Sequence, residues 1–240
     1  MKKIIISLTL IVALLPFGSY ANENFNYEII YEKAKNEYIE NTKEEDLLKK
    51  MLDYTHKDLK EKYDLDIFKE GVTYRIIDNN RYRLGGSTSP LSMVNIFEKN
   101  FDYSSDLVYE TLIHEIGHQV NYRYFTKEDF AKYLSLRGVG LENYIETLKT
   151  SDLNGWQLHL LESFAEDFKT IFQREDYDLK NDTFLGTLNE DEKEVMKDFI
   201  LEVIQKNNSE EKVDEIRWYW FYQNNDDLLE MLEMADKMKL

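Results

Sequence analysis

The pentapeptide His114-Glu115-Ile116-Gly117-His118 constrains this 240-residue chain more than any other feature. It is an HExxH pattern, and residues four apart on an α-helix lie on the same face. His114 and His118 would therefore aim ring nitrogens at one metal ion, with Glu115 placed to act as a general base beside the ion. The alternative is an exposed helix that carries these residues by coincidence. Because the chain has only four histidines, we favour the metal site.

The first 21 residues have the pattern of a secretory signal peptide. Lys2 and Lys3 precede an apolar segment from Ile4 to Leu15, and Ser19-Tyr20-Ala21 offers small residues for cleavage. The apolar segment is shorter than the roughly 20 residues that span a bilayer. We therefore expect a secreted protein; the alternative is an uncleaved N-terminal anchor.

Composition narrows the class of partner. The chain has no cysteine, which excludes disulfides and a lipid anchor on an N-terminal cysteine. Its formal net charge of −17 argues against binding to nucleic acid or to anionic lipid. We expect a protein or peptide substrate, no nucleic acid, no membrane association once the signal peptide is removed, and a monomer.

Few glycines and prolines, with many Glu, Lys and Leu residues, predict a predominantly helical chain that includes a small sheet. Residues 25 to 62 have a helical period and predict two helices. Val72 to Ile77 and Leu91 to Phe97 predict strands, the second of which we expect to be the sheet edge that a bound peptide would extend. Gly85 and Gly86 indicate a bulge or a close backbone approach, and the alternative is an ordinary hairpin loop.

Further helices follow, each with its own boundary signals. They are predicted over Ser105 to Tyr124, Thr126 to Gly138, Leu141 to Leu148, Trp156 to Phe172 and Asn189 to Gln205. Gly117 costs its helix about 1 kcal/mol relative to Ala, so we expect it to permit close packing beside the metal. We expect a signal peptide over 1–21, one domain over 22–206 with a helical lead-in over 22–62, and a helical C-terminal extension over 207–240.

A catalytic zinc ion usually keeps three protein ligands and one exchangeable position, so a third ligand should follow on another element. The metzincin solution needs a histidine six residues after His118, and that residue is Tyr124. A glutamate on a later helix is the other common solution, and Glu162 fits it. Asp152, in a turn-like segment, is the competing third ligand.

The helix that carries Glu162 has other polar residues near the expected site. His159, Glu162 and Glu166 line one face beside an apolar stripe. Glu166 would accept a hydrogen bond from the free N–H of His114, the alternative being a solvated helix charge. His159 is either a helix-surface histidine or a group that stabilises the transition state.

These motifs together resemble one group of proteases. The ordered set of Leu84-Gly85-Gly86-Ser87-Thr88, HExxH and Glu162-Ser163-Phe164-Ala165-Glu166 looks like the gluzincin metalloproteases of the anthrax lethal factor catalytic domain and clostridial Pro-Pro endopeptidase type. The resemblance covers about residues 72 to 172. It implies an α+β zincin-like domain with a small sheet packed on the HExxH helix.

The same resemblance implies roles for individual residues. One Zn²⁺ would be held by His114, His118 and Glu162, with Glu115 as the catalytic base. The substrate would contact Gly85, Gly86, Ser87 and Thr88.

The chain departs from the family at the oxyanion donor. Family members have a tyrosine seven residues before the ligand glutamate, and this chain has Gly155. Tyr144 and His159 are the candidate substitutes. We therefore expect a secreted zinc-dependent endopeptidase that hydrolyses peptide bonds with metal-activated water. The alternatives are a catalytically weakened or inactive zincin-fold binding protein, and a helical exported protein with a coincidental HExxH.

Overall fold

A computed structural model describes most of the chain after the predicted signal peptide. The described residues are 27–33, 37–38, 42–65, 72–77, 86–89, 93–97, 105–150, 160–181, 183, 185–208 and 225–239. Helices account for most of them and the strands form one small sheet, so the fold is α+β and predominantly helical, as predicted. Residues 1–21, Asp152, Gly155 and His159 lie outside the described ranges.

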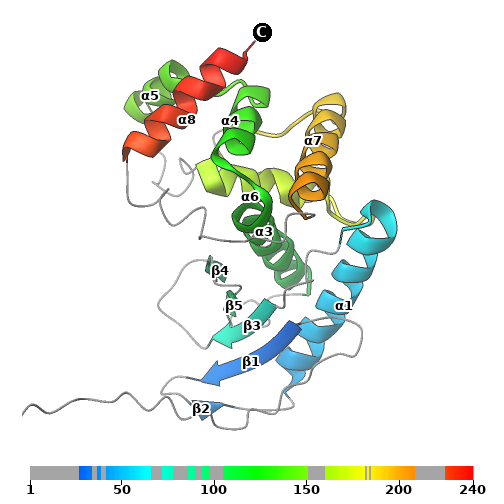
Figure 1. Ribbon diagram of the computed structural model, residues 1–240. Helices are drawn as coiled ribbons and strands as arrows, with labels where there is room; N and C mark the ends of the chain where they lie inside the picture. Colours follow the sequence, from blue (N-terminus) through cyan, green and yellow to red (C-terminus); the bar gives the residue numbers. More distant parts are fainter. Residues whose placement is uncertain are drawn as a thin grey trace, which may run out of the picture.

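The sheet has the strand order β2-β1-β3-β5-β4 (Figure 1). The strands are β1 (Tyr27–Lys33), β2 (Glu37–Tyr38), β3 (Val72–Ile77), β4 (Gly86–Ser89) and β5 (Met93–Phe97). The three central strands are mutually parallel, and the two outer strands run antiparallel to their neighbours. Alternate residues of β3 are buried, as the period of a half-buried strand requires.

The predicted helical lead-in over 22–62 is wrong in its first part. Residues Tyr27–Lys33 form β1, which pairs in parallel with β3 along its length. Tyr-Glu-Ile-Ile-Tyr is rich in aromatic and β-branched residues, and pairing with a neighbouring strand favours the extended form over a helix. Among the described residues of the lead-in, the helical ones are those of α1 (Lys43–Tyr63), which begins with a capping box of Thr42 and Glu45.

The predicted sheet edge is also wrong. The second predicted strand is present as β5, but it lies between β3 and β4. Residues Gly86–Ser89, expected to lie in a bulge or loop, form the outer strand instead. Because β4 pairs antiparallel with the outer side of β5, the edge of the sheet on this side is β4, which begins at Gly86.

Helix α3 (Ser105–Tyr124) is the centre of the molecule. It packs on β4, β5 and α1 on one side, and on α6 (Leu160–Ile171) and α7 (Glu190–Asn208) on the other (Figure 1). Fourteen of its residues are buried, including polar ones. Buried polar groups usually have hydrogen-bond partners. The buried polar residues in the HExxH turn of this helix are therefore candidates for a functional site.

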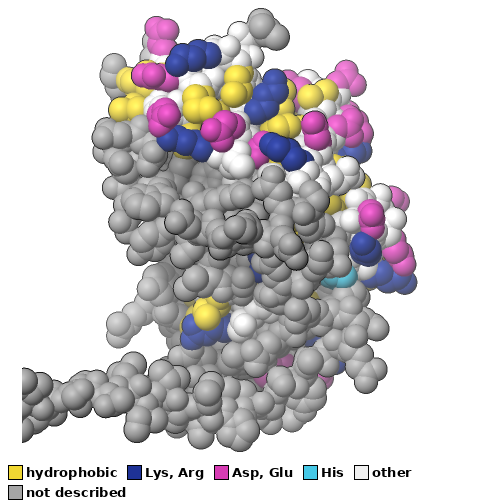
Figure 2. All heavy atoms as spheres, in the orientation of Figure 1, with side chains coloured by type: hydrophobic (Ala, Val, Ile, Leu, Met, Phe, Trp, Pro, Cys, Tyr) yellow, Lys and Arg dark blue, Asp and Glu magenta, His cyan; other side chains and the backbone are white. Residues whose placement is uncertain are grey.

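The remaining helices form a second group around α4 (Lys127–Leu136), which begins with a capping box of Thr126 and Asp129. Helix α8 (Asn225–Met238) packs along α4 and contacts α5 (Leu141–Thr150). The predicted C-terminal extension is therefore helical over 225–238. On the face shown in Figure 2, acidic and basic side chains of the described residues alternate over the upper helices. None of the helices in the described ranges has the length and apolar character needed to cross a bilayer.

Candidate metal centre

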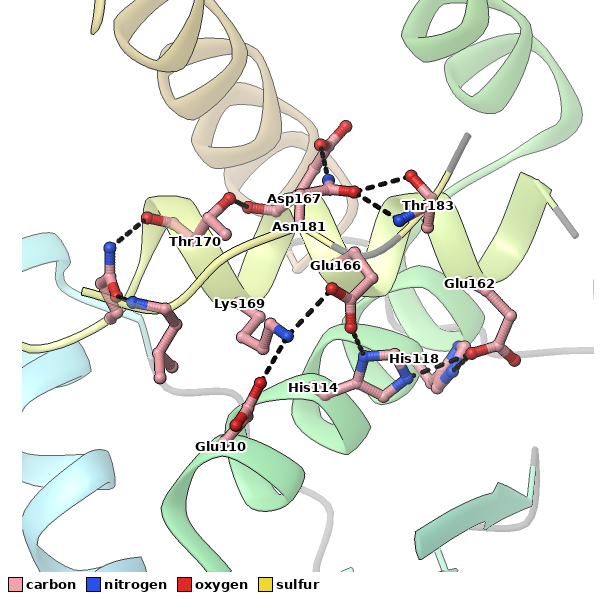
Figure 3. Close-up of polar contacts among 12 residues, drawn as sticks. Glu110, His114, His118, Glu162, Glu166, Asp167, Lys169, Thr170, Asn181 and Thr183 are labelled. Carbon is pink, nitrogen blue, oxygen red and sulfur yellow. Dashed lines mark hydrogen bonds and ion pairs between the residues drawn. The ribbon is translucent and has the colours of Figure 1, made fainter. Parts of the chain in front are cut away.

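His114, His118 and Glu162 meet where α3 lies against α6 (Figure 3). Glu162 Oε2 lies 3.1 Å from His114 Nε2 and 3.4 Å from His118 Nε2. The ligand atoms of the three residues all lie within 4.8 Å of one another. The two imidazole rings are nearly perpendicular, with an interplanar angle of 82°. One carboxylate oxygen thus faces two ring nitrogens from a different helix.

These separations fit a single metal ion. Zinc–nitrogen and zinc–oxygen bonds are about 2.0–2.2 Å long, so tetrahedral ligands stand about 3.3 Å apart. The observed distances of 3.1 and 3.4 Å match that value. Two imidazoles and one carboxylate are a donor set that Zn²⁺ accepts readily. The structure therefore brings together the three ligands predicted from the sequence.

Gly117 makes the close approach of the two helices possible. A Cβ atom added there would lie 3.0 Å from Ala165 Cα and 3.0 Å from Phe168 Cβ. Any larger side chain would push α6 away from α3. The expected close packing beside the site is confirmed, and it sets Glu162, about one turn before Ala165, beside the two imidazoles.

Glu166 supports the first histidine. Its Oε1 lies 2.8 Å from His114 Nδ1, and because a carboxylate only accepts, Nδ1 carries the hydrogen. That tautomer leaves His114 Nε2 free to bind a metal ion. The Glu166 side chain is 4 % exposed, so the alternative of a solvated helix charge is wrong.

Two further residues extend this contact, and the sequence analysis missed both. Lys169 Nζ lies 2.9 Å from Glu166 Oε2 and 2.9 Å from Glu110 Oε1 (Figure 3). Spacing offers a signal for each, because Glu110 lies one turn before His114 and Lys169 lies one turn after Glu166. Polar residues one turn from a proposed ligand or its partner are therefore worth inspecting on both helices.

The electrostatics of the site favour a cation. Burial opposes protonation of His114, but hydrogen bonds to Glu162 and Glu166 outweigh burial and raise its pKa to about 10. Burial tends to raise the pKa of Glu162, yet its hydrogen bonds with His114 and His118 hold that pKa well below its usual range. A proton and a metal ion therefore compete for the same lone pair of His114.

Glu115 lies against the outer strand of the sheet. It is 4 % exposed, and a Cβ atom added at Gly86 would come within 2.8 Å of Glu115 Oε1 and 2.7 Å of the Asn95 carbonyl oxygen. Glycine is required at 86 because β4 passes so close to both groups. The close backbone approach expected from the two glycines is thus present, and it sets the sheet edge beside the proposed base.

The other predicted substrate contacts are only partly described. The backbones of Ser87 and Thr88 belong to β4, and Ser87 Oγ accepts a hydrogen bond from Asn95 Nδ2 at 3.0 Å. Gly85 lies outside the described residues.

The oxyanion donor stays a prediction. Tyr144 lies on α5, half-buried against the hydrophobic core, and burial raises its pKa. His159, the other candidate, lies outside the described residues, as do Gly155 and the competing ligand Asp152.

Helix α6 also carries a second buried polar network, centred on Asp167. Its carboxylate accepts hydrogen bonds from Tyr133 Oη at 2.8 Å and Asn181 Nδ2 at 2.8 Å, and Arg137 Nε lies 3.0 Å away. Burial raises the pKa of Asp167 to about 6 despite the opposing charge of Arg137. Protein donors surround this carboxylate, so it joins α6 to α4 and to the chain that leads into α7.

Compared with known proteins, the chain matches no protein family, no curated protein and no solved structure. The resemblance to gluzincin proteases therefore stays a prediction, and the metal centre stands on its geometry.

Proposed function

We propose that this protein is a secreted zinc-dependent endopeptidase with a zincin-like fold of gluzincin type. The observation that carries the proposal is the position of Glu162 Oε2, 3.1 Å and 3.4 Å from the two HExxH ring nitrogens. Glu115, buried on the same helix, adds a general base beside the three ligands. The predicted signal peptide is the basis for the secreted location.

In this proposal each residue has one task. His114, His118 and Glu162 would hold one Zn²⁺, and the chemistry that this ion would supply is that of a Lewis acid for water and for the peptide carbonyl. Glu115 accepts a proton from the attacking water and delivers it to the nitrogen of the leaving amine. Glu166 keeps His114 in the tautomer that ligates through Nε2.

The edge strand β4 is the proposed substrate platform. An extended peptide can add to a sheet edge through main-chain hydrogen bonds, with its side chains free to select pockets. Since Gly86 lies beside the Glu115 carboxylate, a peptide paired with β4 would bring a backbone carbonyl close to the base. This favours an unfolded or flexible peptide segment as the substrate.

The decisive experiment is digestion of a proteome-derived peptide pool by the protein freed of its signal peptide, with and without a zinc chelator. We expect new peptide ends that disappear with the chelator and return when zinc is restored. The Glu115→Ala variant, loaded with zinc, is the matched control and should cleave about 10²–10⁴-fold more slowly. Cleavage at the wild-type rate in that variant would overturn the proposed mechanism.

The second candidate is a zinc-binding protein of the same fold that does not cleave peptides. The residue that favours it is Gly155, at the position where gluzincin relatives carry a tyrosine. The two candidates differ in the digestion experiment, since a binding protein would hold zinc and yet produce no new peptide ends.

A further inference from the structure

We infer that Lys169 is a positioning residue of the metal centre: it holds Glu166 against His114 and ties helix α6 to helix α3 through Glu110. This inference rests on the proposed function, because it concerns how well the ligands are arranged for a metal ion. Neither the HExxH pattern nor the resemblance to gluzincin proteases assigns a role to this lysine.

The contacts form a continuous chain from the ligand outward (Figure 3). His114 Nδ1 donates to Glu166 Oε1 at 2.8 Å, and Glu166 Oε2 lies 2.9 Å from Lys169 Nζ. Lys169 Nζ in turn donates to Glu110 Oε1 at 2.9 Å. Because each oxygen of Glu166 has its own donor, the carboxylate plane has one orientation. The His114 ring that hydrogen-bonds to it then points Nε2 at Glu162.

Burial gives these contacts weight. The Lys169 side chain is 2 % exposed and the Glu166 side chain is 4 % exposed. An ammonium group taken out of water is costly unless partners compensate it, and here two carboxylates do so. Without Lys169, Glu166 would lose this buried contact with a cation, and its carboxylate could rotate toward other donors or water.

The geometry of the two helices explains why the lysine works on the metal ligand. Glu110 and His114 are one turn apart on α3, and Glu166 and Lys169 are one turn apart on α6. The His114–Glu166 contact and the Glu110–Lys169 contact are therefore two adjacent rungs between the same pair of helices. Both rungs join α6 to α3, and they add to the packing at Gly117 that keeps Glu162 in reach of the imidazoles.

The second histidine lacks comparable support in the described part of the chain. His118 Nδ1 is buried and has no hydrogen-bond partner there. Orientation of the imidazole pair by hydrogen bonds within those ranges is thus concentrated on His114. A change at Lys169 should therefore be felt at the metal.

The test is a double-mutant cycle on zinc affinity, measured by competition with a chromophoric chelator. Outer partners of metal ligands typically contribute about 10–100-fold in affinity. We expect Lys169→Gln to weaken zinc binding by about that factor. In a Glu166→Gln background the same change should have a clearly smaller effect, because only the contact with Glu110 is then left to lose. Equal losses in both backgrounds would overturn the inference.

Lys193→Gln is the matched control, since it also removes a lysine paired with a glutamate three residues earlier. Its partner Glu190 is 2.8 Å away but 88 % exposed, on α7. Zinc affinity should not change in this variant. The absorption spectrum of bound Co²⁺ supplies a second readout: Lys169→Gln should alter it, and Lys193→Gln should not.

Other outcomes remain informative. If Lys169→Gln does not fold, Glu110→Gln takes its place: this partner is 34 % exposed, and its loss should weaken zinc binding in the same direction by a smaller factor. Unchanged affinity in a folded Lys169→Gln or Glu110→Gln variant would overturn the positioning role alone. A wild-type protein that binds no zinc would overturn the metal centre and this role together.

Discussion

Helix α6 carries two buried polar networks on different faces, and they differ in one respect. Toward α4, Asp167 accepts hydrogen bonds from a hydroxyl and an amide, and it forms an ion pair with a guanidinium group. Toward α3, Glu162 directs one oxygen at two imidazole nitrogens. The first network balances its own acceptors with donors. The second gathers three groups that can all donate lone pairs to a cation.

The comparison teaches that burial and charge do not by themselves mark a site. Asp167 is fully buried and its pKa is raised to about 6, yet the protein itself satisfies its carboxylate. The Glu162 side chain is more exposed, at 16 %, and its partners are imidazole nitrogens, a type of ligand that zinc accepts once they are deprotonated. The informative difference is the kind of group that surrounds each carboxylate. Hydrogen-bond donors surround Asp167 and make a structural network, whereas groups that can bind a cation surround Glu162 and make a candidate metal centre.

The largest expected effect tests whether the α3 face carries chemistry. Glu115→Ala should lower peptide cleavage by about 10²–10⁴-fold, because a positioned general base contributes that much. Zinc content, measured on the purified protein, should stay near one ion per chain. Glu128→Ala, at an exposed position on α4, is the control and should cleave like the wild type.

The next effect tests the α4 face. Asp167→Ala leaves Arg137 buried without its carboxylate, and breaking such a pair costs about 3–5 kcal/mol. Chemical denaturation should show that loss in the free energy of unfolding. Zinc affinity of the folded variant should be nearly unchanged, since the two networks lie on different faces of α6. A large loss of zinc affinity with normal stability would erase the distinction between the networks.

A pH titration sharpens the comparison further. The pKa of His114 rises from 6.5 to about 10 on folding, so the metal-free protein gains stability from it below pH 6.5 and loses that gain as the pH rises toward 10. Zinc affinity should rise with pH over the same range, because zinc displaces one proton from His114. The rise should be at most about tenfold per pH unit. Asp167→Asn should not change the slope. Zinc affinity that is flat between pH 7 and 9 would contradict a proton on His114.

The smallest effect concerns ion pairs outside both networks. Lys197 pairs with Glu194 on α7, where the glutamate is 68 % exposed. Exposed pairs contribute at most about 1 kcal/mol, so Lys197→Gln should change stability by less than that. Urea denaturation provides the measurement. A larger loss of stability would contradict the view that exposed ion pairs contribute less to stability than buried ones.

The parts of the site that depend on local spacing were predictable from the sequence. HExxH specified the helix and two candidate ligands, and Glu162 followed as a candidate because a third ligand was expected on a later helix. The contact between Glu166 and His114 was also expected. Lys169 and Glu110 were not, because a lysine or glutamate on a helix is usually a solvated charge until its neighbours are known.

The sheet shows where local reasoning fails. Residues Tyr27–Lys33 have too little periodicity of their own to distinguish helix from strand, and pairing with β3 decides the matter. The position of β4 at the edge depends on strand order, which hydrogen bonds between distant segments establish.

The amino-acid sequence by itself determined the helical HExxH face and the helix start at Thr126, and it predicted a metal site. Those features depend on contacts within one or two turns of a helix. Only the tertiary structure decided that Glu162 meets both imidazoles, that β4 lies beside Glu115, and that Lys169 is buried between two carboxylates. Each of these needs residues far apart in the chain to share one small volume, which local spacing cannot specify.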